Sequence, residues 1–286
     1  MDTQKELNNI LTIASREFKD YVKSKRFILV GILYAVMALA IIGITLVSYD
    51  YSKSMGMAGD FKPSQVLSMM DILNIILVLL AIIITADTIS AERKERTIYQ
   101  LLSKPVERST VVLGKFLGCL SVVSLFFILS SAIAYAITVV FTGVYPSVGD
   151  LAGALEAIVF MVILFAVYVA MGILISTITR SPIISILGGI IVWIALFFSN
   201  ALGNMIGSIS AMNGGMIIFG DPFSEYPIFA KVMVWIDPIS HDIVSTILSG
   251  GVDKVGMPLW ANTLFLMAYA AIMLLTAIEL FKRQDV

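Results

Sequence analysis

The chain has 286 residues, of which 59% are hydrophobic and 14% are charged, and its mean hydropathy is +0.96. A soluble domain carries roughly 25% charged residues, so this composition excludes an ordinary soluble protein and predicts an all-α integral membrane protein surrounded by a lipid bilayer. The formal net charge of −1 gives no bulk attraction to nucleic acid, and the single cysteine, Cys119, excludes an intrachain disulfide.

Residues 4–25 are predicted to form an amphipathic helix. Their apolar side chains fall within about 120° of arc at roughly 100° per residue, the width expected of a one-sided helix. The members of this face are Leu7, Ile10, Leu11, Ala14, Phe18, Tyr21 and Val22, and Ile13 is the only large apolar residue off it. Such a helix lies in the membrane interface, although a helix packed on other protein would show the same pattern.

Six apolar runs follow, each long enough to cross a hydrocarbon core of about 30 Å at roughly 1.5 Å per residue. The predicted spans are 27–48, 66–86, 116–140, 154–178, 183–199 and 259–280. None of the eight prolines lies in the middle of a span, so we expect the spans to be mostly unkinked. We found no internal repeat, and the chain is treated as one transmembrane domain over residues 1–286.

A charge-dense stretch, residues 87–115, separates the second and third spans. Within it Ile98, Leu101 and Leu102 fall at i, i+3 and i+4, which predicts a short helix with one apolar face. Pro105 ends this helix because proline lacks an N–H and its ring clashes with the preceding turn. On these residues alone, the stretch fits a solvated loop, a helix that rests on lipid headgroups, or a docking element for a cytoplasmic partner.

The orientation of the chain follows from the distribution of Lys and Arg. Fifteen of the nineteen basic residues lie in the N-terminal segment, in the 87–115 loop, at Arg180 and at the C-terminus. The other four are Lys53, Lys62, Lys231 and Lys254. Because cytoplasmic loops of membrane proteins carry the excess of basic residues, both termini and the 87–115 loop are predicted to be cytoplasmic.

The long outer segment, residues 200–257, is not expected to be a simple loop. Residues 228–236 are apolar but too few to cross a bilayer. After Asp237 and Pro238, the side chains of Ile239, Ile243, Ile247 and Leu248 share one helical face. We expect short helices here that re-enter the membrane or lie on its outer leaflet.

The chain carries no nucleotide-binding motif. Its one Gly-Lys pair, Gly114-Lys115, is followed by Phe116, so there is no phosphate-cradling loop and the chain is not expected to be an ATPase. The only histidine, His241, lies near Asp237 and Asp242, and such a lone histidine is not expected to hold a metal. We therefore expect no metal, no cofactor and no catalytic residue in this chain.

Acidic residues within the spans lie near their ends, at Asp71, Glu156 and Glu279. A carrier driven by an ion gradient normally needs an ionisable group or a broken helix near the membrane midplane, which the sequence does not show. Asp71 and Asn74 share a helical face and are candidate residues for the outer half of a transport pathway, although interfacial polarity at the entry of a helix is the simpler explanation.

Small residues four apart allow two helices to approach closely. Three such pairs occur, Gly114 with Gly118, Gly172 with Ser176, and Gly203 with Gly207. Each pair is therefore a candidate helix contact.

The stretch between the second and third spans resembles the corresponding loop of the ABC type-2 permeases, the membrane subunits of ATP-driven exporters. The matching residues are Glu92, Thr97, Gln100, Leu101, Leu102, Ser103, Pro105, Arg108, Gly114 and Lys115. Lys94, Arg96 and Tyr99 depart from the pattern, in which an acid, a glycine and an acid are common. The resemblance extends over the whole chain and is greatest to permeases of nitrous-oxide-reductase maturation and of sodium or small-drug export.

This resemblance implies a permease in the cell membrane that works with a second permease chain, as a homodimer, and with two cytoplasmic P-loop ATPase subunits that bind ATP and Mg. It implies a central path between the second and fifth spans and a docking helix for the ATPase. The docking residues would be Glu92, Glu95, Thr97, Ile98, Gln100, Leu101, Leu102, Pro105 and Arg108. Three alternatives remain: a carrier that works without an ATPase, a membrane enzyme, and a passive membrane anchor for a cytoplasmic partner.

Overall fold

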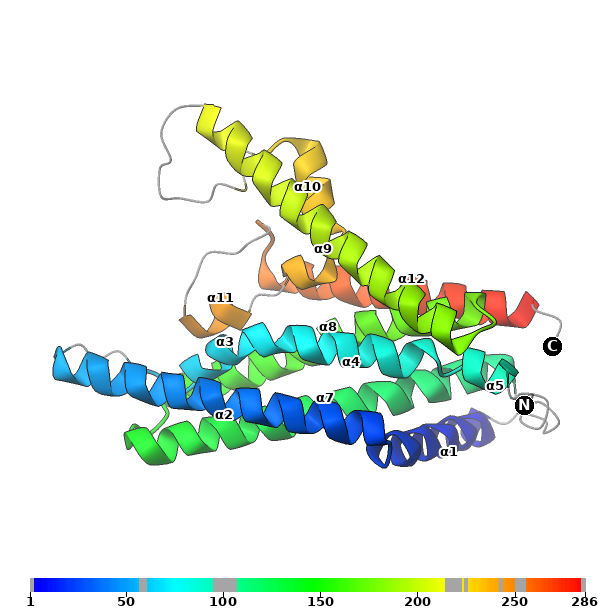
Figure 1. Cartoon of the computed structure of the whole chain (residues 1–286), viewed down its shortest axis with the longest axis horizontal. Coiled ribbons are helices and arrows are strands. Elements are labelled where there is room, and N and C mark those ends of the chain that lie inside the picture. The colour runs from blue at the N-terminus through cyan, green and yellow to red at the C-terminus, as the bar shows by residue number, and fades with distance from the viewer. Residues whose placement is uncertain are drawn as a thin grey trace.

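The computed structural model describes most of the chain, and within the described part it is built from helices joined by turns, with no strand (Figure 1). The described residues are 3–56, 61–94, 107–213, 223, 226–241, 244–249 and 256–283. Among them, six helical stretches are long and apolar enough to cross a membrane. The prediction of an all-α protein with six spans is therefore confirmed.

The first half of the chain forms the N-terminal helix and the first three spans. Its elements are α1 (Thr3–Val22), α2 (Lys25–Ser54), α3 (Gln65–Met70), the 3-10 helix η2 (Asp71–Leu73), α4 (Asn74–Ala86), α5 (Ser90–Lys94) and α7 (Arg108–Thr142). The second half forms the remaining spans and the short helices between the last two. Its elements are α8 (Val148–Ile178), α9 (Pro182–Asn213), α10 (Ile228–Trp235), the 3-10 helix η4 (Pro238–His241), α11 (Val244–Ser249) and α12 (Leu259–Arg283).

Most of the long helices extend beyond the apolar runs that predicted them. Helix α7 begins at Arg108, so Gly114 and Lys115, which were assigned to the end of the charged loop, lie inside a helix. Helix α9 continues to Asn213, so the predicted outer segment begins as a continuation of the fifth span. An apolar run marks only the part of a helix that meets hydrocarbon, whereas the backbone hydrogen bonds continue into the polar flanks.

The second span contains a 3-10 turn, which the sequence did not predict. The 3-10 turn Asp71–Leu73 separates α3 from α4, and no proline is involved. The Nδ2 atom of Asn74 donates a hydrogen bond to Oδ1 of Asp71 over 2.6 Å across this turn. Short polar side chains compete with the regular helical bonds, and a 3-10 stretch within a helix often marks a hinge.

Helices α4 and α8 form the centre of the protein. In the most apolar 18 residues of α8, 61% are buried, against 11% in α9 and 17% in α2. In Figure 1, α9 runs at a steep angle away from the other spans, with α10 beside it. Helices α2 and α9 therefore present their apolar side chains outward, where lipid or another membrane protein would cover them.

Helix α1 confirms a helix in the predicted region, but its apolar face is divided. Leu7 and Leu11 are 57% and 54% exposed. Ile13, which lies off the predicted face, packs against α7 at Gly114. The helix therefore rests on protein along one side, and its position in the membrane interface remains a prediction.

The N- and C-termini lie near the same end of the protein, together with α5 (Figure 1). We expect this end to be cytoplasmic because it carries most of the basic residues. The exposed Lys94 at this end and Val148 at the other, which is 86% exposed, are suited to test the orientation. A Cys119→Ser background removes the buried native thiol.

In that background, Lys94→Cys should react with a membrane-impermeant maleimide only from the cytoplasmic side, and Val148→Cys only from outside. Labelling is followed by gel shift in intact cells and in inverted vesicles. Reaction of both positions from the same side would contradict the six-span topology.

Candidate functional site

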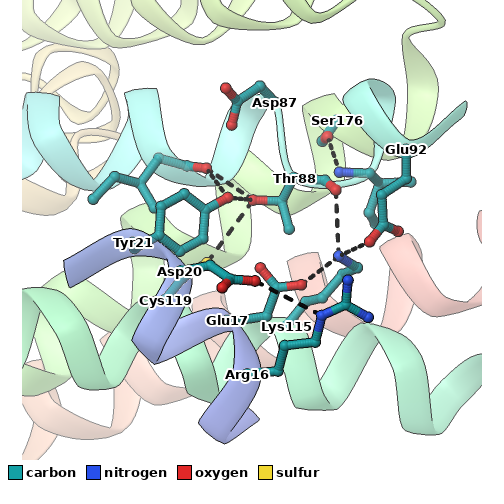
Figure 2. Close-up of polar contacts among 12 residues, drawn as sticks. Arg16, Glu17, Asp20, Tyr21, Asp87, Thr88, Glu92, Lys115, Cys119 and Ser176 are labelled. Carbon is teal, nitrogen blue, oxygen red and sulfur yellow. Dashed lines mark hydrogen bonds and ion pairs between the residues drawn. The ribbon is translucent and has the colours of Figure 1, made fainter. Parts of the chain in front are cut away.

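Lys115 is a buried ion-pair centre at the end of the protein that carries both termini. It lies in α7 and is only 1% exposed. Its Nζ atom donates to Oε1 of Glu17 in α1 over 2.7 Å and to Oε1 of Glu92 in α5 over 2.8 Å (Figure 2). Burying an unpaired ammonium costs several kcal/mol, so the two carboxylates stabilise the charge and tie three helices together. We call Glu17, Tyr21, Thr88, Glu92 and Lys115 the Lys115 junction.

The turn between α4 and α5 positions Glu92 in this junction. The Oγ atom of Ser176, in α8, accepts hydrogen bonds from the backbone N–H groups of Ile89 (2.9 Å) and Ser90 (3.1 Å). These are donors at the start of a helix that have no partner within it. Because Ser176 holds the turn against α8, α5 leaves α4 at a defined angle, and Glu92 points towards α7.

Tyr21 attaches α1 to the end of α4. Its hydroxyl donates to the carbonyl oxygen of Ile84 over 2.9 Å and lies 2.8 Å from Oγ1 of Thr88 (Figure 2). Burial raises the pKa of the Tyr21 hydroxyl well above its usual range, and the nearby thiol and carboxyl groups raise it further. The hydroxyl therefore remains protonated and acts as a donor. The carbonyl of Thr88 in turn accepts from Nζ of Lys115 at 3.4 Å.

Two glycines allow α1 to lie close enough for these contacts. A Cβ atom at Gly114 would lie 2.7 Å from Cβ of Ile13, and one at Gly118 would lie 2.9 Å from the carbonyl oxygen of Ala14. Real Cβ atoms do not approach that closely, so only glycine fits. The predicted close contact at this pair is confirmed, and its partner is the N-terminal helix rather than another span.

The other two small-residue pairs also lie at close helix contacts. A Cβ atom at Gly172 would collide with the Thr85 side chain, so α8 and α4 touch there, and its partner Ser176 holds the turn described above. In α9, a Cβ atom at Gly203 would lie 2.8 Å from the carbonyl oxygen of Ala230, and one at Gly207 would collide with the Tyr226 ring. These glycines therefore bring α10 and the residues before it against α9.

Two arginines attach the ends of the charged segment to the rest of the bundle. Nη1 of Arg93 donates to the carbonyl oxygens of Thr177 (2.9 Å) and Thr179 (3.4 Å) at the end of α8. Nη1 of Arg108 donates to the carbonyl oxygens of Lys282 (2.9 Å) and Phe281 (3.3 Å) at the end of α12. Carbonyl groups in the last turn of a helix lack partners within it, so both arginines act as caps.

The structure therefore assigns contacts within the chain to two of the predicted docking residues, Glu92 and Arg108. The others lie outside the described residues: Glu95, Thr97, Ile98, Gln100, Leu101, Leu102 and Pro105. Sequence reasoning missed the roles of Glu17 and Lys115. One signal in the sequence could have indicated the role of Lys115. This charged residue stands between Gly114 and Phe116, directly next to an apolar run, where a buried position is possible.

The candidate pathway residues lie towards the opposite end. Asp71 is half-buried and lines a cavity of about 320 Å³ between the second and fifth spans. The other lining residues are Ile72, Ile75, Asn200, Asn204, Val234, Ile239 and Ser240. Asn74 does not line this cavity: it is buried, and its Nδ2 atom lies 3.8 Å from Sδ of Met161 in α8. The structure thus keeps Asp71 beside the fifth span and turns Asn74 inward.

Asp237 and His241 fasten the short helices between the last two spans. Asp237 is 1% exposed and accepts hydrogen bonds from the Tyr168 hydroxyl (3.2 Å), Nδ2 of Asn200 (3.1 Å) and the backbone N–H of Ile239 (3.3 Å). Burial raises the pKa of the Asp237 carboxyl, and these donors oppose that effect. The segment around Asp237 is therefore held to both α8 and α9.

His241 is fully buried and makes a contact through each ring nitrogen. Nδ1 lies 2.9 Å from Oδ1 of Asn262, in α12, and Nε2 lies 2.9 Å from the carbonyl oxygen of Trp235. The ring also stacks on Phe265, with the ring centres 4.5 Å apart. Among the described residues, no three His, Cys, Asp or Glu side chains gather as a metal site would require, and Asp242 lies outside them.

Comparison with known proteins adds two findings. The model of a family described as ABC-2 family transporter protein matches residues 11–286. The chain is also similar to the probable ABC transporter permease protein NosY of Stutzerimonas stutzeri, with 27% identity over 112 residues, which is 39% of each chain. The match thus spans about two-fifths of the length of that curated relative.

Proposed function

The chain belongs to the ABC-2 transporter family, and from this premise we propose that it is the permease subunit of an ATP-driven exporter in the cell membrane. Family membership makes it the membrane subunit of an ABC transporter. The proposal adds that a second copy of the chain and two cytoplasmic P-loop ATPase subunits complete the assembly, and that ATP and Mg are bound by the ATPase. Both termini then face the cytoplasm.

One observation carries this proposal: the segment 95–106 is bracketed by residues that are tied into the bundle on both sides. On one side Glu92 binds Lys115 in α7, and Arg93 binds the last turn of α8. On the other side Arg108 binds the last turn of α12. A force applied to the segment would therefore reach α7, α8 and α12 directly, and α1 through Glu17.

Motion at this end has a route to the candidate pathway. Because Ser176 holds the turn between α4 and α5, displacement of α5 is passed to α4. The opposite end of α4 begins directly after the 3-10 turn at Asp71, which lies beside the cavity that faces α9. We infer that closure of the ATPase pair moves α5, and that α4 then changes the separation of the second and fifth spans.

The docking part of this proposal is tested with Leu101→Asp. This change places a charge on the predicted apolar face, which costs several kcal/mol if the charge stays unpaired in a groove of the partner. We expect the affinity for the ATPase to fall at least about tenfold, measured by co-purification and titration, with normal insertion of the permease. Ser103→Asp adds the same charge off that face and should preserve binding. Unchanged binding of Leu101→Asp would rule out the docking helix.

The energy source is tested in proteoliposomes that contain the permease with its ATPase. We expect substrate movement when ATP is supplied and the proton and sodium gradients are collapsed. The carboxylate of Asp71 beside the fifth span favours a second candidate, a carrier driven by an ion gradient. Gradient-driven transport by this chain alone would establish the carrier and refute the ATP-driven exporter.

A further inference from the structure

Asp71 brings a carboxylate into a cavity that contains no cationic partner for it. Its one hydrogen bond within the described part of the chain comes from Nδ2 of Asn74, and none of the described residues that line the cavity is basic. A carboxylate within a membrane-spanning helix is costly and marks a functional site by default. The 3-10 turn in the second span begins at this same residue.

Hydrogen bonds within the protein engage most of the amide and hydroxyl hydrogens around the cavity. Nδ2 of Asn204 donates to Oδ1 (2.6 Å) and the backbone oxygen (3.0 Å) of Asn200. Nδ2 of Asn200 donates to Oδ2 of Asp237 over 3.1 Å. The Ser240 hydroxyl points to the carbonyl oxygens of Val234 (2.6 Å) and Asp237 (2.7 Å). With these donors engaged, the polar part of the wall offers mainly acceptor oxygens, which suits a positively charged ligand.

The remaining wall is apolar and distinguishes between kinds of cation. Ile72, Ile75, Val234 and Ile239 supply hydrocarbon around the single carboxylate. An inorganic cation requires a shell of several oxygen ligands, whereas these four side chains offer only hydrocarbon and Asp71 is the one carboxylate among the described residues that line the cavity. The volume of about 320 Å³ is at the lower end of the range of small-molecule sites, roughly 300–1,000 Å³. One charge within an apolar wall fits a compact, hydrophobic organic cation.

We propose that this cavity is a binding site for hydrophobic organic cations, in which Asp71 supplies the countercharge and Ile72, Ile75, Val234 and Ile239 contact the apolar body. The site lies between the second and fifth spans, so as a transport site it rests on the proposed permease function. Binding itself requires neither ATP nor the ATPase, and the two ideas can fail separately.

The test measures equilibrium binding of tetraphenylphosphonium to the purified permease in nanodiscs of zwitterionic lipid, with empty nanodiscs subtracted. Tetraphenylborate, an anion of the same shape, is the charge control. We expect saturable binding of the phosphonium and none of the borate. Asp71→Asn should weaken phosphonium binding at least about tenfold, because the ion pair is lost in surroundings that screen it poorly, and Asp71→Glu should restore it to within a few-fold.

Two further variants separate this site from general effects. Asp50→Asn removes an exposed carboxylate from α2, outside the residues that line the cavity, and should leave binding unchanged. Asn204→Trp adds bulk at the exposed edge of the cavity without changing its charge and should block binding. Thermal unfolding of each variant in the same nanodiscs shows that the fold is retained.

Equal phosphonium affinity in the parent chain and Asp71→Asn would overturn the proposal, as would equal binding of the borate. Binding of ²²Na⁺ that is lost in Asp71→Asn, together with displacement of phosphonium by NaCl, would assign the site to an inorganic cation instead. If the parent chain does not bind phosphonium but still carries out ATP-driven transport, this inference alone is refuted. Binding retained without ATP-driven transport would refute the proposed exporter alone.

Discussion

Replacement of Lys115 by methionine is expected to destabilise the helix bundle by about 3–5 kcal/mol, the usual cost of removing one partner from a buried ion pair. The change leaves the carboxylates of Glu17 and Glu92 without the ammonium that lies 2.7 and 2.8 Å from them. Methionine fills a similar volume, so the effect reports charge rather than a cavity. The free energy of unfolding is measured by denaturant titration of the permease in mixed micelles.

The exposed pair Arg16–Asp20 supplies the matched control. These side chains are 71% and 67% exposed and their charged atoms are 3.7 Å apart. Solvent screens such a pair, so Arg16→Met should change the free energy of unfolding by no more than about 0.5 kcal/mol. A similarly small loss in Lys115→Met would show that the Lys115 junction does not hold the helices together.

A double-mutant cycle identifies the partner that matters. Once Lys115 is methionine, Glu17→Gln removes a carboxylate that has already lost its cation, so the second change should cost little or should restore stability. We expect an interaction energy of about 0.5–3 kcal/mol between the two positions, as found for residues in direct contact. Strict additivity would mean that Glu17 and Lys115 do not interact in the folded protein.

Gly118→Val is expected to displace α1 from α7 and to destabilise the protein by about 1–3 kcal/mol, the cost of overpacking a close contact. A Cβ atom at this position would lie 2.7 Å from Cβ of Glu17 and 2.9 Å from the carbonyl oxygen of Ala14. The backbone of α1 cannot yield as a flexible side chain would. Displacement of α1 also separates Glu17 from Lys115, so ATP-driven transport should fall together with stability.

Gly43→Val is the control for this prediction. Gly43 lies in α2, and no atom beyond its own stretch of helix lies within 4 Å of the position where its Cβ would be. The same substitution there should leave stability and transport near the parent values, measured by the same denaturant titration and proteoliposome assay. Equal stability of Gly118→Val and Gly43→Val would show that α1 is not held by close contact with α7.

The sequence by itself determined the class of the protein, its helical content and its number of spans. A membrane-spanning helix must satisfy its backbone groups internally and must cross about 30 Å of hydrocarbon, so each span appears as a local apolar run. The predicted orientation likewise depends on local counts of basic residues. The family followed from the motif between the second and third spans, and the family model over residues 11–286 confirmed it.

Only the tertiary structure decided which charged residues lie inside. The charge pattern places Lys115 at the end of the 87–115 loop, yet Lys115 is buried and pairs with Glu17, which is 98 residues away. Periodicity shows which face of α1 is apolar, but not that Ile13 and Glu17 would contact Gly114 and Gly118. The cavity beside α9 also depends on packing between distant segments. Local patterns carry the constraints of the bilayer, whereas ion pairs, close contacts and cavities arise only when the helices meet.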